Sequence, residues 1–393
     1  MRQKICIISF SPVSRDARVL RQIQYLSPHF DLSVVGFGDP LPASATSGNV
    51  QWHPVGPKPR ALHRRLLTRG SLIAGRLAPE LYSWRYWQMN YHREALERAL
   101  AFKAHLYLAD DLTALPVAAE AARRAGAKLA FDAHEYSPLE AEELWWWRML
   151  FRPMVLHFLQ TYARQVDLCL TVCSPIAERY RQEFGLDAKV ILSAPAGRPA
   201  STQAREHGRV RLIHHGGAMR GRKPELMIDA IALCDPRIDL TFMLVPSAAS
   251  PGFVDELQAY AARRAPGRIT FRQPVPPAEI VESIAQFDMG LFLIPPVNYN
   301  WEVCLPNKFF DFITAGLAVC VGPSPAMAEL IKKYGCGCVS PTFDAADMAR
   351  TLNALTPEML ASQQAASRQA ALELNAEVEM RKLIEYIRAT LGS

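Results

Sequence analysis

The sequence predicts an α/β protein with two Rossmann-like, doubly wound domains. Short apolar runs alternate with segments of helical periodicity up to residue 193, and the same alternation restarts at Val210. Strands that alternate with helices form parallel βαβ units, which build doubly wound sheets. Between the two series, residues 194–209 are rich in Ala, Pro, Gly, Ser and Gln, a composition typical of an interdomain linker.

The first half opens with an apolar run at 4–10, which predicts a strand buried on both faces. The elements that follow are a helix at 16–26, strands at 32–37 and 105–109, a helix at 113–125, a strand at 128–132, a long amphipathic segment at 139–165, a strand at 168–172, a helix at 174–185 and a strand at 190–193.

The second half repeats the pattern. It predicts strands at 210–214, 240–245, 269–271, 289–294 and 318–321, and helices at 224–233, 252–264, 277–286, 307–315 and 326–334. We therefore expect domains at 1–200 and 201–370, and an amphipathic helix in 371–393 that packs back on the first domain. Doubly wound sheets bind ligands at the carboxyl ends of their strands, so two of them predict a central cleft for chemistry.

Composition places the chain among soluble globular proteins. Of its 393 residues, 50% are apolar and 21% are charged. No apolar run reaches the roughly 18 residues of a membrane-spanning helix, and residues 4–10 are too short for a secretory signal. We expect a cytoplasmic protein. The eight cysteines show no paired zinc-ligand spacing, which favours buried thiols over a metal site.

A basic and aromatic stretch holds the excess charge. Residues 58–103 carry 10 Lys and Arg against 3 Asp and Glu, interleaved with Leu, Tyr and Trp. The stretch fits a peripheral contact with the inner face of an anionic membrane. It equally fits a site for the phosphate of a lipid-linked acceptor, or a solvated helix pair. Nucleic acid is not expected, because no nucleic-acid module accompanies the charge. Three adjacent tryptophans, at 145–147, cannot all face one core, so at least one is expected to be exposed or to line the cleft.

Residues 214–223, H-H-G-G-A-M-R-G-R-K, join a predicted strand to a predicted helix. Glycines let a backbone approach a ligand closely, and the following helix N-terminus favours an anion. The cations Arg220, Arg222 and Lys223 suit a diphosphate. The spacing matches neither a Walker loop nor G-x-G-x-x-G, which argues against a nicotinamide site. A polar surface turn with solvated cations would show the same sequence.

Residues 306–319, P-N-K-F-F-D-F-I-T-A-G-L-A-V, begin a predicted helix at Pro306 and Asn307. Lys308 adds a cation in the first turn, where a positive charge is disfavoured unless an anion is bound. Asp311 lies one turn later, where its two oxygens could accept hydrogen bonds from both hydroxyls of a ribose. The alternative is an ordinary exposed helix face.

Residues 306–319 resemble the signature helix of the retaining glycosyltransferases of family 4, which have the two-domain GT-B fold. Other motifs of that family follow in order: S-R-D-A-R-V at 14–19, F-D-A-H-E at 131–135, L-T-V-C-S at 170–174, Gly216-Gly217 with Arg222, and D-M-G-L at 288–291. The resemblance covers residues 4 to 390. It implies a metal-independent enzyme that needs no cofactor and takes a nucleoside diphosphate sugar, with a UDP-sugar the first expectation.

The resemblance also implies roles for single residues. Arg222 and Lys308 would act on the leaving diphosphate, and His134 would contact the transferred sugar or the reacting centre. A lone histidine at a strand end is otherwise more often structural. Donor-binding residues would be Gly216, Gly217, Arg220, Lys223, Arg272, Pro306, Asn307 and Asp311, and the acceptor side would include Ser14, Arg15, Asp16 and Glu135.

The sequence departs from the family pattern at several positions. The first loop has Ser11, Pro12 and Val13 in place of paired glycines, and the usual Arg of the diphosphate loop falls on Gly217. The usual ribose Glu is Asp311, and the upstream Glu of the family's pattern falls on Val303.

These features predict transfer of a sugar from a nucleoside diphosphate to a hydroxyl of a glycan or lipid-linked acceptor, in bacterial surface polysaccharide or lipopolysaccharide synthesis. A nucleotide-sugar epimerase of the same fold and a non-catalytic partner subunit are the alternatives. An epimerase would convert the donor without an acceptor, and a non-catalytic subunit would bind no nucleoside diphosphate.

Overall fold

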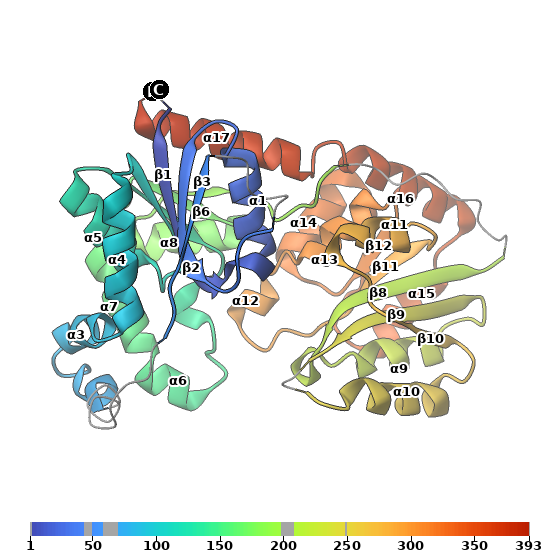
Figure 1. The fold of residues 1–393 in the computed structure, drawn as a ribbon. Coiled ribbons are helices and arrows are strands. Elements are labelled where there is room, and N and C mark those ends of the chain that lie inside the picture. The colour runs from blue at the N-terminus through green and yellow to red at the C-terminus, as the bar shows by residue number, and fades with distance from the viewer. Residues whose placement is uncertain (1, 43–48, 58–69, 198–207, 248–249, 393) are drawn as a thin grey trace. The chain divides into compact units, whose positions relative to one another are not determined.

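The computed structural model describes residues 2–42, 49–57, 70–197, 208–247 and 250–392 (Figure 1). The chain divides into two compact units. The first comprises Met1–Ile191, Asn298–Asn300 and Met380–Ser393, and the second comprises Leu192–Val297 and Trp301–Glu379. Each unit is built around one parallel sheet, so the predicted fold class, two doubly wound α/β domains, is confirmed.

The first unit contains a seven-stranded sheet in the order β3-β2-β1-β4-β5-β6-β7. Every paired strand is parallel to its neighbour. The strand order reverses between β1 and β4, which is where doubly wound sheets bind ligands. The strands are β1 (Lys4–Pro12), β2 (Asp31–Phe37), β3 (Val50–Pro54), β4 (Leu106–Asp110), β5 (Lys128–Ala133), β6 (Leu168–Thr171) and β7 (Ala188–Val190).

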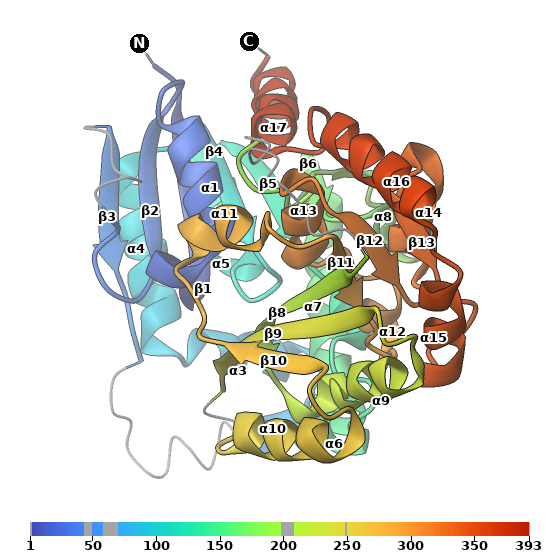
Figure 2. The same ribbon diagram turned by 90° about the vertical axis from the view of Figure 1, so that its right-hand side faces the viewer.

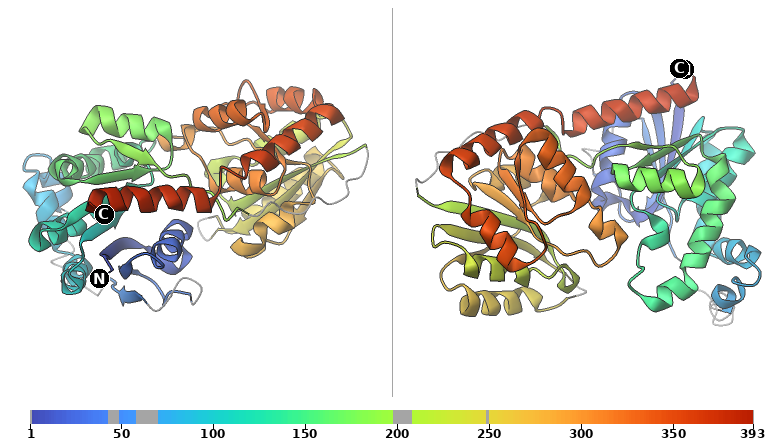
Figure 3. Two further views of the ribbon diagram at one scale, coloured as in Figure 1. Left: turned by 90° about the horizontal axis from the view of Figure 1, so that it is seen from above. Right: turned by 180° about the vertical axis from the view of Figure 1, so that it is seen from behind.

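Helices cover both faces of this sheet. The apolar sides of α1 (Ala17–Leu26) and of the Met380–Leu391 part of α17 (Ala376–Leu391) share one core with β1, β2 and β4 (Figure 3). Helices α4 (Asn90–Phe102) and α5 (Leu115–Ala125) pack against each other and against the other face. The remaining helices are α3 (Glu80–Trp87), α6 (Trp145–Leu150), α7 (Arg152–Tyr162) and α8 (Ser174–Phe184), with short 3-10 turns at 13–15, 137–139 and 163–165.

The structure adds two features that the sequence did not predict in this unit. The amphipathic segment at 139–165 contains two helices, α6 and α7, which are separated at Phe151, and Pro153 lies in the first turn of α7. A proline lacks the amide hydrogen needed in a helix interior, but it fits the first turn of a new helix. The sequence also gave no sign of β3, which pairs with β2 as the edge strand.

The second unit has a six-stranded parallel sheet in the order β10-β9-β8-β11-β12-β13 (Figure 2). Its reversal lies between β8 and β11. The strands are β8 (Val210–Ala218), β9 (Ile238–Pro246), β10 (Ile269–Arg272), β11 (Met289–Phe292), β12 (Ala318–Val321) and β13 (Gly337–Val339). The helices are α9 (Glu225–Leu233), α10 (Phe253–Arg264), α11 (Ile280–Ile284), α13 (Asn307–Thr314), α14 (Pro325–Tyr334), α15 (Ala345–Asn353) and α16 (Pro357–Ala370), with 3-10 turns at 220–222 and 277–279. The short helix α12 (Tyr299–Glu302) is divided between the two units after Asn300.

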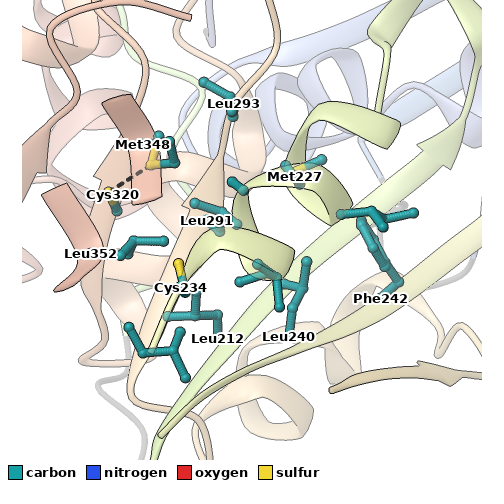
Figure 4. Close-up of a cluster of buried hydrophobic side chains, with 14 of the residues drawn as sticks. Leu212, Met227, Cys234, Leu240, Phe242, Leu291, Leu293, Cys320, Met348 and Leu352 are labelled. Atoms are coloured by element: carbon teal, nitrogen blue, oxygen red, sulfur yellow. Dashed lines mark hydrogen bonds between the residues drawn. The ribbon is translucent and has the colours of Figure 1, made fainter. Parts of the chain in front are cut away.

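Alternate residues of the second sheet enter two separate cores. Leu212, Leu240, Phe242 and Leu291 face α9, α10 and α15 (Figure 4). Their chain neighbours, such as Ile213 and Phe292, face α11, α13, α14 and α16. This alternation fixes the strand register, because a slip by one residue would move each side chain to the wrong core.

Gly290 in β11 holds α13 close to the sheet. A Cβ atom at this position would lie 2.1 Å from the ring of the buried Phe312 of α13. Only glycine allows this approach, which brings the first turn of α13 to the end of β11. None of the described helices is both long enough and apolar enough to cross a bilayer.

We predict that Gly290→Ala destabilises the protein by about 1–3 kcal/mol, the usual effect of overpacking a core. Gly221→Ala is the matched control, because a Cβ there has no neighbour within 4 Å. Urea unfolding followed by circular dichroism measures both variants. Equal stability of the two would show that the approach of α13 does not depend on Gly290.

Candidate functional site

Three carboxylates meet at the strand-order reversal of the first unit. Strand pairing places Ser9 beside Asp110 and Asp110 beside Asp132, at the carboxyl ends of β1, β4 and β5. Asp111 follows directly on β4. Ser9 Oγ donates a hydrogen bond of 2.7 Å to Asp110 Oδ2. Asp132 and His134 belong to a motif that was singled out from the sequence, whereas Asp110 and Asp111 were not, although a D-D pair after a predicted strand could have indicated them.

Asp132 is neutralised by a buried arginine. Arg18 Nε and Nη2 lie 2.8 and 2.7 Å from the two oxygens of Asp132, in a bidentate pair. The Gln22 side chain also donates to Asp132. Burial alone would raise the pKa of Asp132, but Arg18 and His134 outweigh it and hold that pKa well below the usual range. Asp132 is therefore an anion that orients its neighbours.

His134 lies against this acidic group, with 19% of its side chain exposed. Its Nε2 is 2.8 Å from Asp110 Oδ1 and 3.6 Å from Asp132 Oδ2, and its Nδ1 is 3.7 Å from Asp111 Oδ2. Burial lowers the pKa of His134, but the carboxylates of Asp110 and Asp132 raise it by more, so the net pKa is well above the ordinary value. His134 is thus an imidazolium at neutral pH, suited to donate a hydrogen bond rather than to accept a proton.

Asp111 combines an unusual backbone with an accessible carboxylate. Its φ is 67°, a left-handed conformation that is uncommon for non-glycine residues, although Asp adopts it more readily than most. Partial burial raises its pKa above the ordinary value, His134 opposes this shift, and Asp110 and Asp132 add to it. Since 47% of the side chain is exposed, water limits the shift.

The group of Asp110, Asp132 and His134 has ligand atoms within 4.8 Å of one another, a spacing that could hold a metal ion. The contacts do not fit one. Both oxygens of Asp132 face Arg18, and Oδ2 of Asp110 accepts from Ser9. A metal would lie beside a buried guanidinium, while the protonated His134 already supplies positive charge.

A cavity of about 550 Å³ opens beside His134 within the first unit. It is walled by residues from β1, β2, α3, α4 and the 134–158 region. The lining residues are Phe10, Phe37, Arg85, Tyr86, Met89, Tyr91, His92, Asp111, Leu112, Thr113, His134, Glu135, Ser137, Glu140, Trp147, Phe151, Met154, Val155 and Phe158.

The residues expected on the acceptor side separate into two groups. Glu135 lines this cavity with His134. Asp16 instead caps α1, where its Oδ1 accepts from the amides of Arg18 and Val19 at 3.1 and 3.2 Å. Ser14 and Arg15 belong to the 3-10 turn before α1, and Arg15 is exposed. None of these three lines the cavity.

In the second unit, a buried lysine lies at the strand-order reversal. Lys308 is 8% exposed, and its ammonium is packed against Gly216 in β8. A Cβ at Gly216 would come within 2.9 Å of Lys308 Nζ, and the φ of Gly216 is +123°. Glycine is therefore required here both for space and for conformation.

Two histidines flank this lysine. His214 Nδ1 is 2.8 Å from the carbonyl oxygen of Leu291, so Nδ1 carries the proton and Nε2 is free to accept from Lys308 Nζ at 3.3 Å. Burial and then Lys308 lower the pKa of His214 well below its ordinary value, and lower that of His215 to about 3. His215 Nε2 lies 3.5 Å from Asp311 Oδ2. Both histidines are neutral, and sequence reasoning gave neither of them a role.

The charge of Lys308 is only weakly compensated. Burial lowers the pKa of Lys308 to about 7, and the Arg222 guanidinium contributes to this lowering. Burial also lowers the pKa of Arg222, whose Nη1 is 3.5 Å from the Gly217 carbonyl oxygen and whose guanidinium lies over the Trp301 ring at 5.7 Å. A site with two cations and little negative charge favours an anionic ligand.

The other expected donor-site cations lie in different environments. Arg220 forms a bidentate pair with Glu256 of α10 at 2.6 and 2.7 Å and covers the Phe253 ring. Lys223 is exposed, in a left-handed conformation with a φ of 44°. Arg272 is exposed at the end of the edge strand β10, and its guanidinium lies 5.2 Å from the centre of the Phe287 ring.

The first turn of α13 presents the remaining donor-site candidates. Pro306 is the residue before α13, and the exposed Asn307 is its first residue. Asp311 lies one turn after Lys308 and is partly buried. Of the two residues at the upstream family position, Val303 is buried at 4% exposure and Glu302 is exposed.

Part of the basic stretch at 58–103 lies outside the described residues, namely 58–69, and with it five of its cations. In the described part, Tyr82 and Tyr86 are buried whereas Trp84 is 41% exposed. Of the three adjacent tryptophans, Trp147 is buried, and Trp145 and Trp146 are 69% and 42% exposed. The expectation that at least one of them is exposed is confirmed.

Solved structures of the same fold span nearly the whole chain. HepE (Alr3699) of Anabaena, in complex with UDP and glucose, has a TM-score of 0.71 at 16% identity and covers 99% of this chain and 100% of its own. Sucrose-phosphate synthase of Thermosynechococcus elongatus has a TM-score of 0.72 at 14% identity with 100% coverage of both chains. The lipopolysaccharide outer core galactosyltransferase WaaB, in its apo form, has a TM-score of 0.67 at 11% identity and covers 98% of this chain and 99% of its own.

No family model and no curated protein matches the sequence. The likeness to these structures therefore establishes the fold, which is that of the GT-B glycosyltransferases.

Lys308 gives a prediction for stability against pH. Because its pKa is about 7 in the folded protein and near 10.5 when unfolded, folding releases a proton between these values, and stability rises with pH across this window. Lys308→Met removes the cost of the buried charge. We predict that the variant exceeds the wild type in free energy of unfolding by a few kcal/mol at pH 6, and that this gain falls toward pH 10. Urea unfolding at both pH values measures this, and a gain independent of pH would contradict it.

His134 gives a prediction of opposite sign. Its pKa is raised in the folded state, so its ion pairs stabilise the protein fully below about pH 6.5, the unfolded value, and this contribution is lost as pH rises through the folded pKa. We predict that His134→Gln loses more stability at pH 6 than at high pH. A ring-proton NMR titration of His134 checks the cause directly. Titration at or below pH 6.5 would refute the assignment of an imidazolium.

Proposed function

We propose that the protein is a glycosyltransferase that moves a sugar from a nucleoside diphosphate sugar to a hydroxyl acceptor. The observation that carries this proposal is the buried, poorly compensated Lys308 beside Gly216 at the strand-order reversal of the second unit. Doubly wound sheets bind nucleotides at this position, and a diphosphate would supply the missing negative charge. HepE, which has this fold, was solved in complex with UDP and glucose and with UDP-glucose, which supports a UDP-sugar as the first donor to test.

Lys308 and Arg222 would stabilise the negative charge that grows on the leaving diphosphate, and Gly216 and Gly217 would let the backbone approach it. Asp311 would accept hydrogen bonds from the ribose hydroxyls. The edge-strand end at 272–276 would contact the base. Fixed cations would replace a metal ion in this scheme, so no cofactor is required.

The first unit would bind the acceptor beside His134. Because His134 is an imidazolium held by Asp110 and Asp132, it would donate a hydrogen bond to a sugar hydroxyl and would not act as a base. Asp111 is the nearby carboxylate whose raised pKa suits proton exchange. Retention of the anomeric configuration and a role in polysaccharide or lipopolysaccharide synthesis are proposed on the resemblance to family 4.

Removing either cation should weaken donor binding and slow turnover. We predict that Lys308→Met or Arg222→Ala lowers turnover of the matching nucleotide-sugar by about 10²–10³-fold, the usual effect of losing one group that stabilises transition-state charge. Lys332→Met is the control, because Lys332 is exposed on the surface of α14. A thermal-shift panel of UDP, GDP, ADP and CDP sugars selects the donor first. Near-normal transfer by both variants would refute the assignment, and conversion of the donor without an acceptor would indicate an epimerase.

Donor binding should also take up a proton. Since Lys308 has a pKa of about 7 without ligand, it is largely neutral at pH 8, and a bound diphosphate favours its charged form. We predict net proton uptake when UDP binds at pH 8, and much less for Lys308→Met. Calorimetry in two buffers of different ionisation enthalpy measures the uptake. Equal binding enthalpies of the wild type in both buffers would contradict it.

A further inference from the structure

The cavity of the first unit has two chemically different parts. One part carries the polar groups near His134, namely Asp111, Glu135 and Glu140, and α3 adds one charged side chain, Arg85, to the lining. The other is formed by the wall of α6 and α7, which contributes Trp147, Phe151, Met154, Val155 and Phe158, all without charge. A ligand that fills the cavity must therefore carry a polar group at one part and an apolar group at the other.

Several polar side chains of the lining are already satisfied. Tyr86 donates its hydroxyl to the carbonyl oxygen of Thr113 at 2.6 Å, and His92 Nδ1 lies 2.7 Å from the carbonyl oxygen of Tyr86. Their rings stack at 3.5 Å between centroids. These residues present ring surfaces to a ligand, and burial keeps His92 neutral by lowering its pKa to about 4.

A sugar chain does not suit the apolar part. Each buried hydroxyl without a hydrogen-bond partner costs free energy, and the α6–α7 wall offers few partners. An alkyl chain gains free energy from the same surface in proportion to the area that it buries. The cavity volume of about 550 Å³ lies within the range of small-molecule sites.

The outer side of the same wall is apolar and exposed. While Trp147 faces the cavity, the exposed residues around it form what we term the α6 patch: Ile73, Leu77, Leu144, Trp145, Trp146 and Met149. Leu77 is 93% exposed, and Arg76 Nη1 lies 3.9 Å from Met149 Sδ, which joins the 70–77 segment to α6. Exposed tryptophans beside arginines such as Arg76 and Arg148 are typical of surfaces that bind an anionic membrane interface.

We propose that the cavity holds the apolar chain of a membrane-borne, lipid-linked acceptor, with the α6 patch resting on the membrane and the acceptor's polar head at His134 and Asp111. The role as acceptor rests on the proposed function, whereas binding of the chain does not. The α6–α7 wall then selects the acceptor by its apolar chain. The α6 patch places the cavity next to the membrane that holds this acceptor.

Chain binding can be measured without any donor. The probes are n-alkyl β-glucosides from methyl to octyl, below their micelle concentrations, titrated calorimetrically. We expect affinity to rise up to about fourfold for each added methylene that is buried, until the chain fills the cavity. Equal affinity for methyl and octyl glucoside would overturn the proposal. Because donor is absent, this result is independent of whether a nucleotide-sugar binds.

Variants locate the bound chain. Met154→Trp fills the cavity and Phe151→Ala removes part of its wall, so each should abolish or strongly reduce the dependence on chain length. Trp145→Ala, on the outer side of the same helix, is the control and should retain it. If Trp145→Ala loses the dependence and the two cavity variants keep it, the chain binds on the surface and the cavity assignment is wrong.

A second arm tests the source of the lipid. Vesicles of phosphatidylcholine with anionic phosphatidylglycerol should co-sediment the full chain, and Trp145→Glu with Met149→Glu should reduce binding at least tenfold while octyl glucoside affinity is kept. Octyl glucoside binding without any vesicle binding by the wild type would show a soluble amphiphile instead, and would overturn the membrane part of the proposal.

Discussion

The burial of the Lys308 side chain against Gly216 is the constraint on which the proposed anion site of the second unit depends. Lys308 lies against the backbone of Gly216 and 3.3 Å from a neutral histidine, His214, with the Arg222 guanidinium nearby. Such an arrangement costs stability in the empty protein, since a buried charge needs a compensating partner. Two glycines leave space for this arrangement. Gly290 lets the Phe312 ring of α13 lie close to β11, and Gly216 leaves room for the Lys308 ammonium beside β8. This loss of stability is offset when a bound ligand compensates the buried charge.

The first unit also buries charged side chains, but there they pair with one another. Its buried charges are compensated internally, because Arg18 neutralises Asp132 and the carboxylates of Asp110 and Asp132 hold His134 as a cation. The Arg18–Asp132 pair is fully formed without a ligand. The two strand-order reversals thus differ in chemistry. One is an electropositive site for an anion, and the other is a rigid hydrogen-bonding group beside a largely apolar cavity.

Sequence periodicity predicted the two sheets well, because buried parallel strands are short apolar runs and the helices between them are amphipathic. It missed the edge strands β3 and β13, whose residues are only partly buried, and it did not place the break at Phe151, which Pro153 could have indicated. Lys308 could be named because it is a cation in the first turn of a predicted helix, and His134 because the resemblance to family 4 implies its role. Arg18 and His214 could not be given roles, since their partners Asp132 and Leu291 lie 114 and 77 residues away. Pairings of this kind are set by strand order, which the local sequence does not contain.

The proposed function requires that a bound diphosphate compensates the charge of Lys308. The most direct measurement is an NMR titration of the Lys308 side chain in protein labelled on lysine Cε, with Lys308→Met to assign the signal, in the absence and presence of UDP. A pKa near 7 in the free protein that rises when UDP binds is the predicted result. A pKa near 10.5 in both samples, or one that UDP leaves unchanged, would contradict the account.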